Sequence, residues 1–180
     1  MNQPFTRSFL AIGALFVIGA FSVAQADDDD CDEKDGYKRV EVNGVGTHYF
    51  DSLVVHKSRP TENGLRQTAT ETIDLTGDLE GRVLYQPTSV IDYAAGTMVN
   101  TGKQVFSGTI LGGKPVMIFD DEFRFDVNLI TGEVRGKVYL TDRVSGPKAV
   151  CELEVTGTAP PNAAAADFAY SGYCKIKRRK

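Results

Sequence analysis

The sequence predicts an all-β protein: a single antiparallel β-barrel, a meander of about eight or more strands, after a cleaved signal peptide. From Gly36 onward glycine is frequent, and Val, Ile, Thr, Tyr and Phe fill the segments between the turns. Several segments alternate apolar and polar residues, as strands with one buried face do. Long helical periodicity is missing, and the one helix-like stretch, 162–167, is too short to form a stable helix.

The first 26 residues show the three parts of a secretory signal peptide. Arg7 supplies a positive charge, residues 9–23 form an apolar run, and Ala24-Gln25-Ala26 is the small-x-small pattern that precedes cleavage. The run is shorter than the roughly 20 apolar residues that a spanning helix needs, although an uncleaved anchor is the alternative. No later segment is long enough to span a bilayer. We therefore expect an exported, soluble protein, periplasmic or secreted, without an integral membrane segment.

The remaining chain divides into three parts. Residues 27–36 form an acidic leader, expected to be disordered because seven carboxylates within residues 27–35 repel one another. A calcium loop is the alternative, but its spaced ligands and central glycine are missing. Residues 37–176 form the barrel domain. Residues 177–180 are a basic tail that could solubilise the chain end or contact anionic lipid. A formal net charge of −4 gives no reason to expect nucleic acid as a partner.

The candidate strands are short and closely spaced. In chain order they are residues 37–42, 47–57, 67–75, 81–86, 88–93, 103–111, 116–119, 122–128, 133–141, 149–156 and 168–176. Turn residues separate most of them, at 60–64, 76–78, 112–113, 131–132 and 145–147. Such a chain can form a barrel or a two-sheet sandwich. A meander of hairpins favours the barrel, because closure removes edge strands.

One hairpin is legible in the alternation of its residues. In 122–128, Phe123, Phe125 and Val127 share one face, and charged residues occupy the other. After a turn at 130–132, an apolar face continues through Val134 and Leu140, with Glu133, Arg135 and Lys137 opposite. We expect one buried face, and pairs of opposite charge across the wet face.

The last hairpin predicts a disulfide. A loop centred between Asn162 and Ala163 places Cys151 directly opposite Cys174 on the apolar face of the two strands. Cross-strand Cα separations of about 4.5 to 5.5 Å suit a disulfide, and an exported protein meets oxidising conditions. Cys31 is then left over in the acidic leader. It can stay free, link two chains or compete for one of the other two cysteines.

Three segments together have a familiar rhythm: ETIDLTGDLEGRVLY at 71–85, VFSGTILGG at 105–113 and DVNLITGEVRG at 126–136. This pattern resembles exported bacterial relatives of the allene oxide cyclase and dirigent-type β-barrels, over about residues 67–176. Avidin-like and lipocalin-like barrels share much of the same rhythm. The resemblance implies a barrel that acts as a cyclase or steers a reactive intermediate. No catalytic residue of the family is carried over to this chain.

The two histidines, His48 and His56, offer a weak case for chemistry. They are eight residues apart, so in an unbroken strand they share a face at a separation of about 26 Å. A bulge at 51–52 would change this geometry, but a shared metal site is not expected. The favoured interpretation is two strand or loop histidines near the surface.

Glu71 and Tyr85 are the other candidate site residues. Glu71 shares parity with Ala69 and Ile73, so it either points inward, where it could transfer protons, or faces water or Arg82 at a strand end. The second orientation is favoured, because carboxylates are rarely buried. Tyr85 either orients a ligand through its hydroxyl or packs in the core.

No catalytic motif is present, and neither a metal nor a cofactor is expected. Three functions stay open: a module that binds a small apolar molecule, with Glu71, Tyr85 and His48 as candidate ligand-binding residues; a cyclase or isomerase; and a structural or interaction protein with a filled barrel. The oligomeric state cannot be predicted. A cavity inside the barrel would favour the first two functions, and an inward Glu71 or His48 would favour chemistry.

Overall fold

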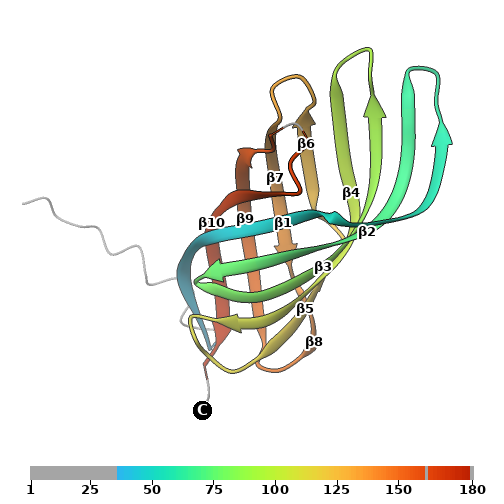
Figure 1. Cartoon of the computed structure of the whole chain (residues 1–180). Coiled ribbons are helices and arrows are strands. Elements are labelled where there is room, and N and C mark those ends of the chain that lie inside the picture. The colour runs from blue at the N-terminus through green and yellow to red at the C-terminus, as the bar shows by residue number, and fades with distance from the viewer. Residues whose placement is uncertain (1–35, 161, 179–180) are drawn as a thin grey trace, which may run out of the picture. The chain divides into compact units, whose positions relative to one another are not determined.

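The computed structural model describes residues 36–160 and 162–178, and in this part all regular secondary structure is β (Figure 1). The strands are β1 (Tyr37–Pro60), β2 (Gly64–Gly77), β3 (Leu79–Asp92), β4 (Thr97–Ile110), β5 (Val116–Asp120), β6 (Arg124–Asn128), β7 (Glu133–Leu140), β8 (Asp142–Ser145), β9 (Ala149–Thr158) and β10 (Ala165–Lys177). Residues 1–35 lie outside the described part. The predicted signal peptide, the acidic leader and Cys31 therefore stay predictions.

The strands close into an eight-stranded antiparallel barrel with short additional strands, which confirms the predicted fold class. Neighbours along the chain pair as a meander through β1, β2, β3 and β4. β4 then pairs with β6 near one end and with β5 near the other. β6, β7, β9 and β10 follow, and β10 pairs with β1 over thirteen residue pairs, so the first strand meets the last.

Two strands are longer than the turn signals indicate. β1 runs through the gap between the predicted strands 37–42 and 47–57, and β3 runs through Pro87. Pro87 lacks an N–H group, yet it pairs with Gly102 of β4 and is fully buried. Glycine at position 102 is required, because a Cβ there would lie 2.3 Å from the carbonyl oxygen of Gln86. The helix-like stretch 162–167 forms no helix, and its last three residues begin β10.

One end of the barrel is a packed core. Leu79, Phe106, Ile118, Cys151 and Cys174 have no exposed surface there. Val42, Ile110, Val116 and Ala149 surround them and are also buried. Large apolar side chains that fill this end stabilise the fold by burial, at roughly 1.5–3 kcal/mol for each fully buried side chain. The β4–β5 and β8–β9 turns lie at this end, and the β1–β2, β3–β4 and β6–β7 hairpins extend from the opposite end (Figure 1).

The predicted hairpin alternation is present in β6 and β7. Phe125, Val134, Val138 and Leu140 are buried, and the charged residues between them are exposed. The charges, however, pair along each strand rather than across it: Arg124 binds Asp126, and Arg135 binds Glu133. Lys137 instead reaches across to Glu154 of β9. Exposed pairs of this kind contribute little stability.

Tyr170 of β10 fastens the turn between β2 and β3 to the barrel wall. Its hydroxyl accepts a hydrogen bond from the backbone N–H of Leu79 at 2.8 Å and lies 3.1 Å from the carbonyl oxygen of Thr76. Gly44 makes room for it, since a Cβ at that position would lie 2.3 Å from the hydroxyl oxygen.

The predicted disulfide is present. Cys151 of β9 faces Cys174 of β10 in the predicted register, with a Cα separation of 4.1 Å. Both side chains are fully buried in the packed end. In the described residues, no helix is long and apolar enough to cross a lipid bilayer.

The disulfide should contribute substantially to stability. Replacing both Cys151 and Cys174 by Ala should lower the free energy of unfolding by about 2–5 kcal/mol, because the unfolded chain loses a cross-link that closes a loop. Denaturant titration under non-reducing conditions measures this. A tryptic digest without reductant should yield the two cysteines in one linked peptide pair. Free thiols at both positions would contradict the disulfide.

Candidate functional site

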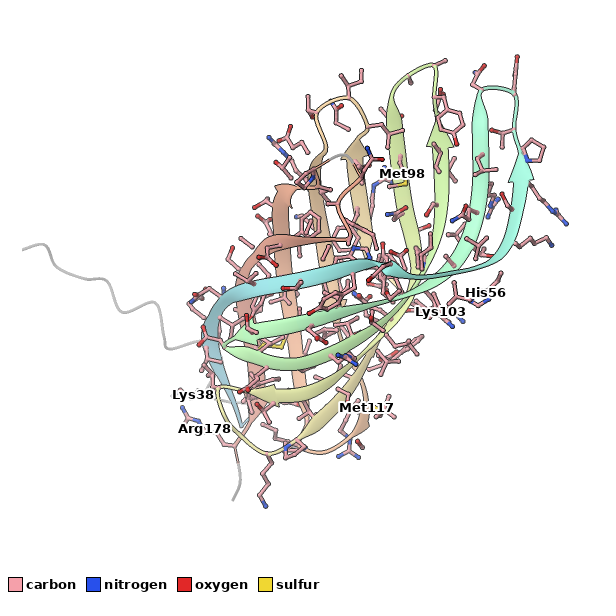
Figure 2. The ribbon with its side chains drawn as sticks, viewed as in Figure 1. Lys38, His56, Met98, Lys103, Met117 and Arg178 are labelled. Carbon is pink, nitrogen blue, oxygen red and sulfur yellow. A yellow bond between two sulfur atoms is a disulfide. The ribbon has the colours of Figure 1, made fainter. Side chains whose placement is uncertain are left out.

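The barrel contains a cavity of about 270 Å³. It begins above the packed end, at Leu140 and Tyr170, and reaches Ile91, Met98 and Val127, which lie next to the β3–β4 and β6–β7 hairpin turns. Met98 marks this upper region in Figure 2. The interior is therefore filled at one end and hollow toward the other.

Polar side chains in the cavity are concentrated on one wall. Strand pairing places Glu71 of β2, Tyr85 of β3 and Gln104 of β4 side by side in one inward row, which continues to Asp120 of β5. A second inward row, closer to the hairpin ends, contains Gln67, Ser89 and Asn100. Each of these side chains lines the cavity, except that of Asp120.

Small or compact residues separate the two polar rows. Ala69 lies between Gln67 and Glu71 on the inward face of β2, and Pro87 and Gly102 occupy the corresponding positions of β3 and β4. Because these residues project little into the barrel, they leave space in front of the polar wall.

The opposite wall is apolar. Its side chains come from β6, β7, β9 and β10 and are Phe125, Val134, Val138, Leu153, Val155 and Phe168. The cavity thus has one hydrogen-bonding side and one hydrophobic side, the combination typical of sites for small organic molecules.

His48 and Glu71 form a closely bonded pair in the polar wall. His48 Nε2 lies 2.5 Å from Glu71 Oε2, and the side chains are only 15% and 11% exposed. The hydrogen bond holds the imidazole against the carboxylate, so a proton can be shared or passed between them. The ring of His48 also packs against Phe50, Tyr85 and Phe168, at centroid distances of 4.7, 5.6 and 6.4 Å.

A bulge in β1 places this histidine. Tyr49 pairs with Thr72 and Val54 pairs with Thr70, so four residues of β1 face a single residue of β2. Ser52 replaces the missing ladder contacts, because its hydroxyl accepts a hydrogen bond from the N–H of Thr72 at 3.0 Å and donates one to the carbonyl of Tyr49 at 2.6 Å.

The two histidines consequently do not share a face. His48 lies in the cavity wall, and His56, beyond the bulge, is exposed and bonds to Thr70 on the outside of the barrel (Figure 2). The favoured interpretation of His48 as a surface histidine is therefore wrong. Among the described residues no group of three potential metal ligands is present.

The favoured orientation of Glu71 is also wrong. The side chain points into the barrel, and Arg82, its expected partner outside, binds Asp74 instead, with bonds of 2.6 and 2.9 Å. That bond to Arg82 lowers the pKa of the Asp74 carboxyl. Glu71 is tolerated inside because His48 supplies a hydrogen-bonding partner.

Tyr85 lies deepest in the polar wall and is only 2% exposed. Burial raises the pKa of its phenol far above the ordinary value, and the negative charge of Glu71 raises it further. A hydrogen bond donated to the phenol oxygen by the amide group of Asn100 partly opposes this rise in pKa, because it stabilises the phenolate. Tyr85 therefore remains a neutral phenol beside the His48–Glu71 pair, in contact with the rings of Phe123 and Phe125.

Asn100, Gln104 and Asp120 were not candidates on sequence grounds. Asn100 carries a buried Oδ1 atom that has no hydrogen-bond partner among the described residues. Gln104 donates from Nε2 to Asp120 Oδ2 at 2.7 Å, and Asp120 also accepts from the backbone N–H groups of Glu122 and Tyr139. Gln104 lies within the predicted strand 103–111, where its period-2 alternation was the available signal, and the same alternation would have found Asn100 if that strand had been extended back to Thr97.

Comparisons with known proteins find no counterpart: no family model, no curated protein and no solved structure matches this chain. The site is therefore interpreted from its own geometry.

The buried phenol should be visible in alkali. Seven tyrosines are present in the chain, and burial raises the pKa of Tyr85 and of Tyr170. The unfolded chain releases these protons above pH of about 10 and the folded chain keeps them, so the free energy of unfolding should fall as pH rises beyond that point. In a spectrophotometric titration, the absorbance change from ionisation of Tyr85 should appear only when the barrel unfolds.

The variant Tyr85→Phe should show a shallower fall of the free energy of unfolding with alkaline pH. Tyr93→Phe is the matched control, because Tyr93 is 63% exposed. If all tyrosines ionise near the ordinary phenol pKa while circular dichroism shows an intact fold, the buried position of Tyr85 is incorrect.

Proposed function

We propose that this protein is an exported β-barrel that binds a small, largely apolar molecule in its interior. The cavity carries the proposal: a space of about 270 Å³ with an apolar wall facing a polar wall. Its size approaches the roughly 300 Å³ at which small-molecule pockets begin. A barrel filled by its own side chains would need no such space, so the hollow half favours binding over a purely structural role.

The polar wall would fix the orientation of the ligand. Apolar contacts with residues such as Val155 and Phe168 supply affinity without direction, and a few hydrogen-bonding groups select one pose. His48, Glu71 and Tyr85 are the groups that we propose for this selection. Export is part of the proposal: the predicted signal peptide and the buried Cys151–Cys174 disulfide are both compatible with an oxidising compartment.

Filling the cavity with a larger side chain should weaken ligand binding. The variant Val155→Phe places a ring in the space in front of the polar wall, and the overlap should weaken binding of the neutral fluorophore N-phenylnaphthylamine at least about tenfold, or 1.4 kcal/mol. Fluorescence titration measures the affinity. Native mass spectrometry of the purified wild-type protein would show a co-purified molecule directly.

Val90→Phe is the matched control, because the same substitution then lies on the outside of β3, where Val90 is 47% exposed. Its affinity should equal that of the wild type. Equal affinities of all three proteins would place the fluorophore elsewhere and defeat the proposal.

A second candidate function is a cyclase or isomerase, and the His48–Glu71 pair favours it. Such reactions need a substrate held in one conformation and a group that moves a proton. An apolar cavity with one bonded acid–base pair offers both. The resemblance to allene oxide cyclase and dirigent-type barrels belongs to this proposal, since those proteins include cyclases and proteins that steer a reactive intermediate.

In this second function Glu71 would take a proton from carbon, and His48 would position its carboxylate. The Kemp elimination of 5-nitrobenzisoxazole tests this step: the base removes the C3 proton, the N–O bond breaks, and a nitrile and a coloured phenolate form. Glu71→Gln should lower the rate by roughly a hundredfold, a typical contribution of a general base. Glu80→Gln, on the exposed face of β3, should not change the rate. A wild-type rate no faster than that of Glu71→Gln would exclude the second function and leave binding intact.

A further inference from the structure

The charges around the cavity restrict the chemistry of the ligand. Among the residues described, no lysine or arginine lines the cavity. The carboxylate of Glu71 lines the cavity, and the carboxylate of Asp120, which is 1% exposed, lies outside the lining, next to Gln104 in the same row. His48 is the one group in the lining that can become positive, and it is already bonded to Glu71.

The hydrogen-bonding atoms of the cavity restrict the chemistry of the ligand further. Buried Asn100 Oδ1 is an acceptor without a partner, and Glu71 presents a second carboxylate oxygen beyond the one bonded to His48. A buried acceptor without a donor is unfavourable, so a ligand that supplies a donor would recover this loss. The aromatic rings of Phe50, Tyr85 and Phe168 surround His48, and the faces of such rings attract cations.

We propose that the ligand has an apolar body and a head group that donates hydrogen bonds, a hydroxyl or a protonated amine, and that the cavity excludes carboxylates. This inference rests on the proposed binding function and names the class of molecule. A carboxylate head would lie beside Glu71 with no lysine or arginine among the described lining residues to compensate its charge, since His48 is already bonded to Glu71. A buried charge without a partner of opposite sign is strongly unfavourable, and a like charge at close range makes it more so. A hydroxyl or ammonium head would instead satisfy the acceptors already present.

The test compares three molecules with one body: octanol, octylamine and octanoate. Isothermal titration calorimetry of the mature protein should show octanol and octylamine binding at least about tenfold more tightly than octanoate, the ratio that 1.4 kcal/mol produces. Glu71→Gln should lower the affinity for octylamine by about tenfold or more and the affinity for octanol by less. It should also narrow the difference in affinity between octanol and octanoate. Val155→Phe reports binding outside the cavity, and Glu80→Gln controls for the loss of a distant negative charge.

Each outcome decides one claim. If octanoate binds the wild type as tightly as octanol, the charge argument is overturned and the binding function stands. If none of the three binds the wild type, or all bind Val155→Phe equally well, the proposed function fails and this inference fails with it. Should Glu71→Gln not fold, as judged by circular dichroism, the wild-type ratio of octanol to octanoate alone confirms or overturns the selectivity.

Discussion

The pairing of β1 with β10 is the constraint on which the rest of the structure depends. It joins the first strand to the last and leaves no open edge between them. Once the sheet is closed, each barrel strand has one inward and one outward face within the barrel, and the register of each pair decides which side chains meet inside. The alignment of Glu71, Tyr85 and Gln104 in one row follows directly from that register. The polar wall is thus a product of closure and of local sequence together.

The bulge between Tyr49 and Val54 is the larger of two register shifts in the pairing of β1 with β2, and it separates the two halves of β1 functionally. Before the bulge, the inward face of β1 carries His48 into the cavity; after it, β1 forms an exposed arm with β2 that carries His56 outside. Bulges often occur beside functional sites because they redirect a side chain without ending the pairing. Here the redirected strand also brings the Ser52 hydroxyl to the N–H of Thr72, which gives that N–H a hydrogen-bond partner across the irregularity.

Much of the fold could be predicted from the sequence, because alternation and turn residues are local signals. The register of β9 and β10 was also accessible, and with it the Cys151–Cys174 bridge. The limits lie where tertiary pairing overrides a local signal. Pro87 marks a break in the chain pattern, yet Gly102 opposite it allows β3 to continue. Glu71 looks like a surface residue until His48 is placed beside it. That contact joins residues 23 apart in the chain, and the bulge between Tyr49 and Val54, which the sequence indicates at 51–52 only as an alternative, lies directly after His48. Asp120 is similar, since its partners come from three separate segments.

The division of the barrel into a packed end and a hollow end has a consequence for how this protein can change. Substitutions near Phe106 or Cys174 act on folding, because those side chains are fully enclosed. Substitutions around the cavity, at Val155 or Asn100, act mainly on what fits inside. Since the two sets of residues occupy different layers, mutation can explore new ligand preferences while the cross-linked base preserves the fold. The same separation makes the chain a suitable scaffold for laboratory evolution, because the cavity residues can vary while the packed end is kept constant.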